Sequence, residues 1–226
     1  MSKKGEIRWF SDDILRDNVE YSRKIYNLLE QDLSTCTECV TLDPDNLGAF
    51  SFRLADLILR VGPEILRVFN LILFNRRREG SFTVEPRLEK AIIDVQRRKE
   101  QKRDGFDDYL DATCIARAQG LKVIKVPVKT LGKFLVPFET EERMKNGKAF
   151  DVVPWWEDGY NALKHRVIEE FRTSATLKHA LFSLAGLWTL HYVLDYDWDR
   201  KGIARSEFFE QPAASVVDRL YLEQLK

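Results

Sequence analysis

The chain contains few cysteines and has no formal net charge. The 226 residues include 3 cysteines, Cys36, Cys39 and Cys114, which cannot pair completely. The first residues are charged rather than apolar, so no secretory signal is indicated, and we expect a cytoplasmic protein. Lys+Arg and Asp+Glu both number 36, which gives a formal charge of zero. Because proteins that coat nucleic acid non-specifically are usually basic, this balance argues against that class.

Long apolar runs and the common catalytic loops are also missing. The most apolar window, residues 181–194, is shorter than a membrane-spanning helix and contains Ser183, Thr189 and His191. We interpret it as a buried core helix and expect no membrane partner. The chain has no Gly-rich phosphate loop, no Gly-x-Ser-x-Gly elbow and no His-Glu-x-x-His. P-loop nucleotide hydrolysis, serine hydrolase chemistry and zincin chemistry are therefore unsupported.

Metal-ligand spacing occurs once. Cys36 and Cys39 are three residues apart, as in many metal and redox motifs. A structural zinc ion needs four ligands, and only Cys114 and scattered histidines could complete the set. We keep zinc as a minor alternative and predict no metal and no cofactor.

What the chain does have is helical periodicity. The strongest pattern covers residues 47–79, interrupted at Gly62-Pro63, where proline predicts a kinked or broken helix. Further helices are expected over residues 7–42, 86–103, 106–118, 158–171 and 175–194. The stripe of the first pattern consists of Leu54, Leu57, Ile58, Val61, Ile65, Val68, Phe69 and Ile72. That of the last consists of Leu177, Leu181, Leu184, Trp188 and His191.

β-Structure is expected in one place. Residues 121–129 and 133–136 predict a small hairpin, with Pro127 restricting its strand to an edge or a bulge. We interpret residues 139–151 as a polar loop. The predicted fold is mainly α, an antiparallel helical bundle with a β-hairpin insertion at about 121–138. It divides into an N-terminal helical extension (1–46), a helical domain (47–194) and a C-terminal tail with a short helix (195–226).

The segment from Tyr160 to Arg166 contains the candidate residues for acid–base catalysis. Asn161 and His165 are four residues apart and would share a helix face. A histidine titrates near neutral pH, so His165 could act as the base that takes the 2′-hydroxyl proton of RNA without a metal. Lys164 or Arg166 could supply positive charge to the phosphate. Asn161 could orient the ring or the phosphate.

The same residues also have a structural interpretation. Glu64 lies on an otherwise apolar stripe, and a buried carboxylate needs a partner. Lys164 and His165 are the natural partners, in which case His165 would fix the packing of two long helices. His179 and His191 are more typical of packed residues than of ligands. Trp155 and Trp156 fit packing anchors better than a platform for stacked bases.

The order of these motifs resembles a set of bacterial helical proteins. The matching features are Trp155-Trp156, the Tyr160 to His165 segment, the Ala-rich helix that begins near Ala175, and the upstream helix with Gly62 to Ile65. That set is similar to the HEPN superfamily (higher eukaryotes and prokaryotes nucleotide-binding domain). The resemblance implies a helical bundle that often dimerises. Many HEPN domains are metal-independent ribonucleases of toxin-antitoxin, phage-defence and CRISPR systems.

The resemblance assigns roles within that motif, which is an arginine, a polar residue and then a histidine. Asn161 matches the polar residue and His165 the histidine, while Gly159 and Tyr160 stand where the arginine is expected. Two hypotheses follow. The chain is an RNA-directed ribonuclease or RNA binder with a homodimer or a protein of the same system as partner. Alternatively, it is a non-catalytic dimerisation or partner-docking module with a structural Glu-Lys-His cluster.

Overall fold

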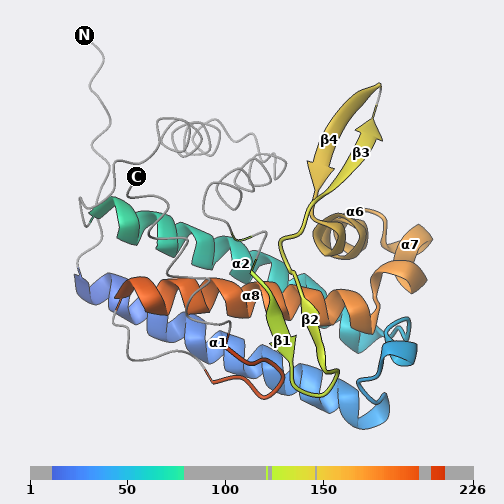
Figure 1. The fold of residues 1–226 in the computed structure, drawn as a ribbon, viewed down its shortest axis with the longest axis horizontal. Helices are drawn as coiled ribbons and strands as arrows, with labels where there is room; N and C mark the ends of the chain where they lie inside the picture. Colours follow the sequence, from blue (N-terminus) through green and yellow to red (C-terminus); the bar gives the residue numbers. More distant parts are fainter. Residues whose placement is uncertain (1–11, 79–120, 122–123, 146, 199–204, 212–226) are drawn as a thin grey trace.

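Three long helices form the body of the part of the chain that the structure describes (Figure 1). The computed structural model describes residues 12–78, 121, 124–145, 147–198 and 205–211. The long helices are α1 (Asp12–Cys39), α2 (Phe52–Arg78) and α8 (Leu177–Trp198). The prediction of a mainly helical protein with a small antiparallel hairpin is therefore confirmed. The helices predicted over 86–103 and 106–118 and near the C-terminus lie outside the described residues.

Helices α2 and α8 run parallel, and α1 runs opposite to both (Figure 1). The segments that lead into α2 and α8 pair: Ser51 N–H donates to the Ala175 carbonyl at 3.2 Å, and Leu177 N–H donates to the Ala49 carbonyl at 2.8 Å. The predicted antiparallel bundle is therefore wrong for α2 and α8, whereas α1 is antiparallel to both. Antiparallel neighbours follow from short connections. Here residues 79–176 separate the two helices, enough chain to return to the starting end.

The core lies where α2 packs on α8 with α1 beside them. Every residue of the predicted α2 stripe is buried, and so is every residue of the predicted α8 stripe. Almost every described position of α8 is buried, which fits a helix that is apolar around its whole circumference. None of the helices within the described residues has the length and apolar character needed to span a bilayer.

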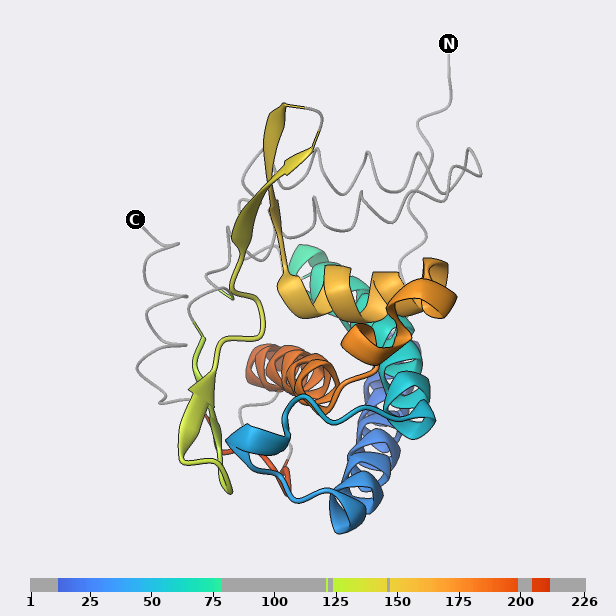
Figure 2. The same ribbon diagram turned by 90° about the vertical axis from the view of Figure 1, so that its right-hand side faces the viewer.

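Two separate β-hairpins accompany the helices in the described part of the chain. Strands β1 (Val126–Val128) and β2 (Lys133–Leu135) pair antiparallel, which confirms the predicted hairpin. Gly132 in its turn has φ 58°, a conformation that glycine adopts at little cost. Figure 2 shows α8 between this hairpin and helix α1.

The second hairpin corrects the sequence interpretation. Strands β3 (Glu141–Lys145) and β4 (Lys148–Val152) pair antiparallel, so the predicted polar loop over 139–151 is wrong. This hairpin projects away from the helical body (Figures 1 and 2). Most of its described side chains are exposed, so the segment lacks the apolar alternation by which half-buried strands are recognised.

Candidate functional site

The segment around His165 is not the single helix that its periodicity predicts. It consists of a π-helix, η3 (Trp155–Asn161), a short α6 (Ala162–His165) and α7 (Val167–Ser174). The backbone N–H of Ala162 donates to the Glu157 carbonyl, a π-type bond. Between α6 and α7, Arg166 leaves helical geometry with φ −132° and ψ 28°. Departures of the π type are frequent at functional sites.

His165 lies on the surface, at the last position of α6. Its side chain is exposed, and so are those of Lys164 and Arg166. Within the described residues, the imidazole makes no hydrogen bond or ion pair. The Lys164 ammonium lies 5.8 Å from the centre of the Tyr160 ring. The predicted site residues are therefore brought together at the surface, and His165 does not join the core.

Glu157 connects two of the predicted site residues. The Asn161 side-chain amide donates to Glu157 Oε2 at 3.0 Å, so it is directed to this carboxylate and not to the imidazole. The Arg166 guanidinium lies 3.9 Å from Glu157 Oε1 and forms a closer pair with Glu170 at 2.9 Å. Part of the positive charge beside His165 is therefore neutralised before any ligand arrives.

Glu64 is buried, as predicted, but its partners are different. Arg67 donates to both carboxylate oxygens, at 2.9 Å and 2.6 Å, and Ser22 of α1 donates to Oε1 at 2.6 Å. The predicted pairing of Glu64 with Lys164 and His165 is wrong, because His165 lies exposed at the surface and Arg67, one turn along the same helix, is closer. Glu64 joins α1 to α2 and leaves His165 without this structural role.

The positions where the HEPN motif has an arginine are used for packing. Tyr160 is buried, which raises the pKa of its phenol, and its ring lies against α2. A Cβ placed on Gly62 would come within 2.2 Å of that ring. One placed on Gly159 would come within 3.0 Å of the His179 side chain. The tyrosine ring and the glycine therefore fill packing positions against α2 and α8, and neither position supplies a cation to the site.

Sequence reasoning missed a buried polar cluster between α1 and α8. Ser22 Oγ lies 3.2 Å from His191 Nε2 while it donates to Glu64. Four residues along α1, the Tyr26 hydroxyl donates to Glu30 at 2.9 Å, and Glu30 also accepts from Ser206 Oγ. Burial lowers the pKa of His191 to about 3, so the ring is neutral. Ser22, Tyr26 and Glu30 follow one another at four-residue spacing on α1, and this pattern could have predicted a polar face on that helix.

The remaining aromatic and histidine candidates are packing residues, as predicted. Trp155 and Trp156 are both buried, and the Trp155 indole donates to the Pro137 carbonyl at 2.5 Å. His179 is buried beside the Ser174 carbonyl, with 3.0 Å between that oxygen and Nδ1, and burial lowers its pKa. His191 is fully buried.

Metal ligands do not gather in the part of the chain that the structure describes. No group of three or more His, Cys, Asp or Glu side chains there could hold an ion. Cys36 and Cys39 are free thiols at the end of α1. Comparison with protein-family models, with curated proteins and with solved structures found no match to this chain.

Proposed function

We propose that this chain is an HEPN-like protein of a bacterial defence or toxin-type system, and that it binds RNA and cleaves it without a metal ion through His165. The observation that carries the proposal is the exposure of His165 beside Lys164 and Arg166. An imidazole on the surface contributes nothing to the core. Its neighbours give it the charge that a phosphate recognises.

The local backbone supports a functional interpretation of this surface. His165 lies between the π-helix η3 and the interruption at Arg166, so the side chains there are not presented by a regular helix. π-Helices are rare and occur frequently at functional sites. The buried residues of η3 pack into the core, whereas the side chain of His165, one turn further along, is exposed.

In the proposed mechanism, His165 in its neutral form takes the proton of a ribose 2′-hydroxyl. The resulting oxygen attacks the adjacent phosphorus, the bond to the 5′-oxygen of the next nucleotide breaks, and the products are a 2′,3′-cyclic phosphate and a 5′-hydroxyl that takes its proton from His165 or from water. Lys164 and Arg166 balance the charge that develops on the phosphate oxygens. The Asn161 amide donates to Glu157, whose carboxylate lies 3.9 Å from the guanidinium of Arg166, the residue that follows His165. With Gly159 and Tyr160 fixed by packing, Arg166 takes the part of the motif arginine.

A second candidate function is favoured by a specific surface. Phe52 is 81% exposed and Ile168 is 95% exposed. The Phe52 and Phe171 rings pack with 4.6 Å between their centres, and Phe50 lies 6.3 Å from Phe171. Ile168 lies three residues before Phe171 on α7, a spacing that places two side chains on one helix face, and we call Phe50, Phe52, Ile168 and Phe171 together the aromatic patch. Exposed apolar clusters of this kind are typical of protein interfaces, which favours a homodimer or a docked partner protein.

RNA binding tests the main proposal. Fluorescence anisotropy with a labelled single-stranded RNA should show an affinity that falls with salt, because phosphate contacts release counterions. Lys164→Ala and Arg166→Ala should each weaken binding about threefold to tenfold and reduce the salt dependence. Lys178→Ala, an exposed cation near the start of α8, is the matched control and should bind like the wild type. Equal losses for all three variants, or no binding by the wild type, would contradict the proposal.

A further inference from the structure

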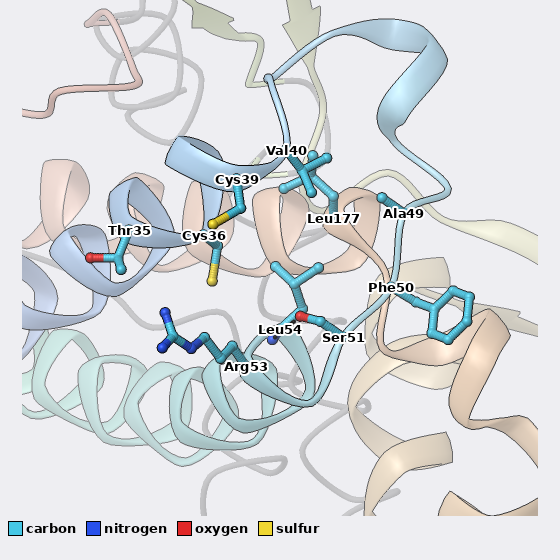
Figure 3. Close-up of a pocket in the computed structure, with 10 residues that line it drawn as sticks. All are labelled: Thr35, Cys36, Cys39, Val40, Ala49, Phe50, Ser51, Arg53, Leu54 and Leu177. Carbon is cyan, nitrogen blue, oxygen red and sulfur yellow. Dashed lines mark hydrogen bonds between the residues drawn. The ribbon is translucent and has the colours of Figure 1, made fainter.

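A pocket opens at the end of the molecule where α1 ends and α2 and α8 begin (Figure 3). Its volume is about 240 Å³, close to the lower end of pockets that hold small molecules. The apolar part of its wall is formed by Val40, Ala49, Phe50, Leu54 and Leu177. The pocket lies outside the His165 surface and has no part in the mechanism proposed above.

A single cation stands at this apolar pocket. The Arg53 side chain extends from α2 toward Thr35 and Cys36 of α1 (Figure 3). Among the described residues, no carboxylate pairs with Arg53, whereas Arg60 on the same helix pairs with both Asp32 and Asp56. Within the described part of the chain, Arg53 therefore brings a positive charge that forms no ion pair to a wall that is otherwise largely apolar.

Two thiols complete the lining. Cys36 and Cys39 are three residues apart on the last turn of α1, and both contribute to the pocket wall. Burial raises the pKa of the Cys36 thiol, even though Arg53 acts in the opposite direction. A protonated thiol is a weak nucleophile and behaves as a small apolar group. The cysteines thus add to the apolar wall and offer a chemical probe of its occupancy.

We propose that this pocket binds a small amphipathic anion, a carboxylate with a short alkyl or aryl body. The apolar body lies against Val40, Leu54 and Leu177, and the carboxylate pairs with the Arg53 guanidinium. Burial of the apolar body supplies the affinity. The guanidinium supplies selectivity for carboxylate, because its planar fork matches the two oxygens. This ligand is separate from RNA, so the proposal does not depend on the function of His165.

Protection of the two thiols tests the proposal in the full-length protein. Alkylation of Cys36 and Cys39 by iodoacetamide is followed by mass spectrometry of the peptide that carries both. Octanoate at millimolar concentration should slow the alkylation, and octylammonium, with the same chain and the opposite charge, should not. In Arg53→Gln the octanoate concentration that gives half-maximal protection should rise about fivefold, the effect of one partly exposed ion pair. Arg53→Lys should retain part of the protection.

Lys178→Gln is the matched control, because it removes an exposed cation that does not line the pocket. Its protection by octanoate should equal that of the wild type. Melting temperatures of the variants establish that each remains folded. Absence of protection by octanoate in the wild type would overturn the proposal. So would equal protection by octylammonium, or protection unchanged in a folded Arg53→Gln.

Discussion

At the scale of single residues, the sequence predicts whether a polar side chain is buried better than it predicts which residue that side chain bonds to. Glu64 on an apolar stripe needs a partner, and the sequence places it correctly in the interior. Arg67, three residues along the same helix, could have been proposed from spacing alone, whereas Ser22 depends on which face of α1 meets α2. The exposure of His165 could not be predicted either, because the local sequence does not distinguish a surface histidine from a buried one.

Gly62 gives a direct test of the close approach between α2 and η3. In an exposed helix, Gly→Ala stabilises by about 1 kcal/mol. Here the added methyl group would overlap the Tyr160 ring, so Gly62→Ala should lower the free energy of unfolding by about 1–3 kcal/mol. Urea denaturation measures the difference. Gly48→Ala is the control, because a Cβ at Gly48 meets nothing within 4 Å. A Gly62→Ala variant as stable as the wild type would show that the approach is looser than described.

His191 predicts how stability depends on pH. Its folded pKa of about 3 lies below the value of about 6.5 for an unfolded histidine, because burial disfavours the charged ring and Arg23 and Arg67 add repulsion. Between these two values the unfolded state binds a proton that the folded state does not. His191 therefore contributes full stability above about pH 6.5, and this contribution falls by about 1.4 kcal/mol per pH unit as the pH drops toward 3.

The comparison with His191→Gln isolates this contribution. Glutamine can still hydrogen-bond to Ser22 but does not titrate, so carboxylates and His179 affect both proteins alike. The difference in unfolding free energy between wild type and variant should shift steadily in favour of the variant from pH 6.5 to 4.5. A difference that stays constant over this range would mean that His191 titrates normally in the folded protein.

At the scale of elements, buried helices are predicted well and half-exposed ones are not. Every stripe residue of α2 and α8 is buried, since their patterns are strong. On α1 the apolar residues divide between the two faces: Val19 and Leu29 are buried, Tyr21 and Leu28 are exposed, and the core also receives Ser22 and Tyr26. A helix whose buried face carries hydroxyl groups gives an ambiguous pattern.

The aromatic patch on α7 and the start of α2 tests the second candidate function. If two copies associate through it, Ile168→Glu and Phe52→Glu should each shift the protein from dimer to monomer, because a charge in an apolar interface is costly. Light scattering over a range of concentrations measures the shift. Phe134→Glu is the control, since Phe134 is also exposed but lies on β2. A monomeric wild type at every concentration would remove the homodimer.

At the scale of the whole molecule, the parallel arrangement of α2 and α8 brings the starts of both helices to one end. The aromatic patch and the Arg53 pocket both lie at this end. The sequence predicts the helices but not this gathering, which depends on the path of the long connection between them. The segment from Tyr160 to Arg166 can be recognised in the sequence because its residues are neighbours in the chain. Its exposure follows only from how η3 and α8 pack.

Cleavage of RNA by wild type and His165→Ala, with melting temperature recorded on the same samples, tests the central claim most directly. We expect the wild type to cleave RNA in the presence of EDTA. In His165→Ala the cleavage rate should fall about 10²–10⁴-fold, the usual contribution of a general base. Its melting temperature should remain unchanged, because the side chain is exposed. A loss below roughly tenfold, or a lower melting temperature together with an inactive wild type, would contradict the account.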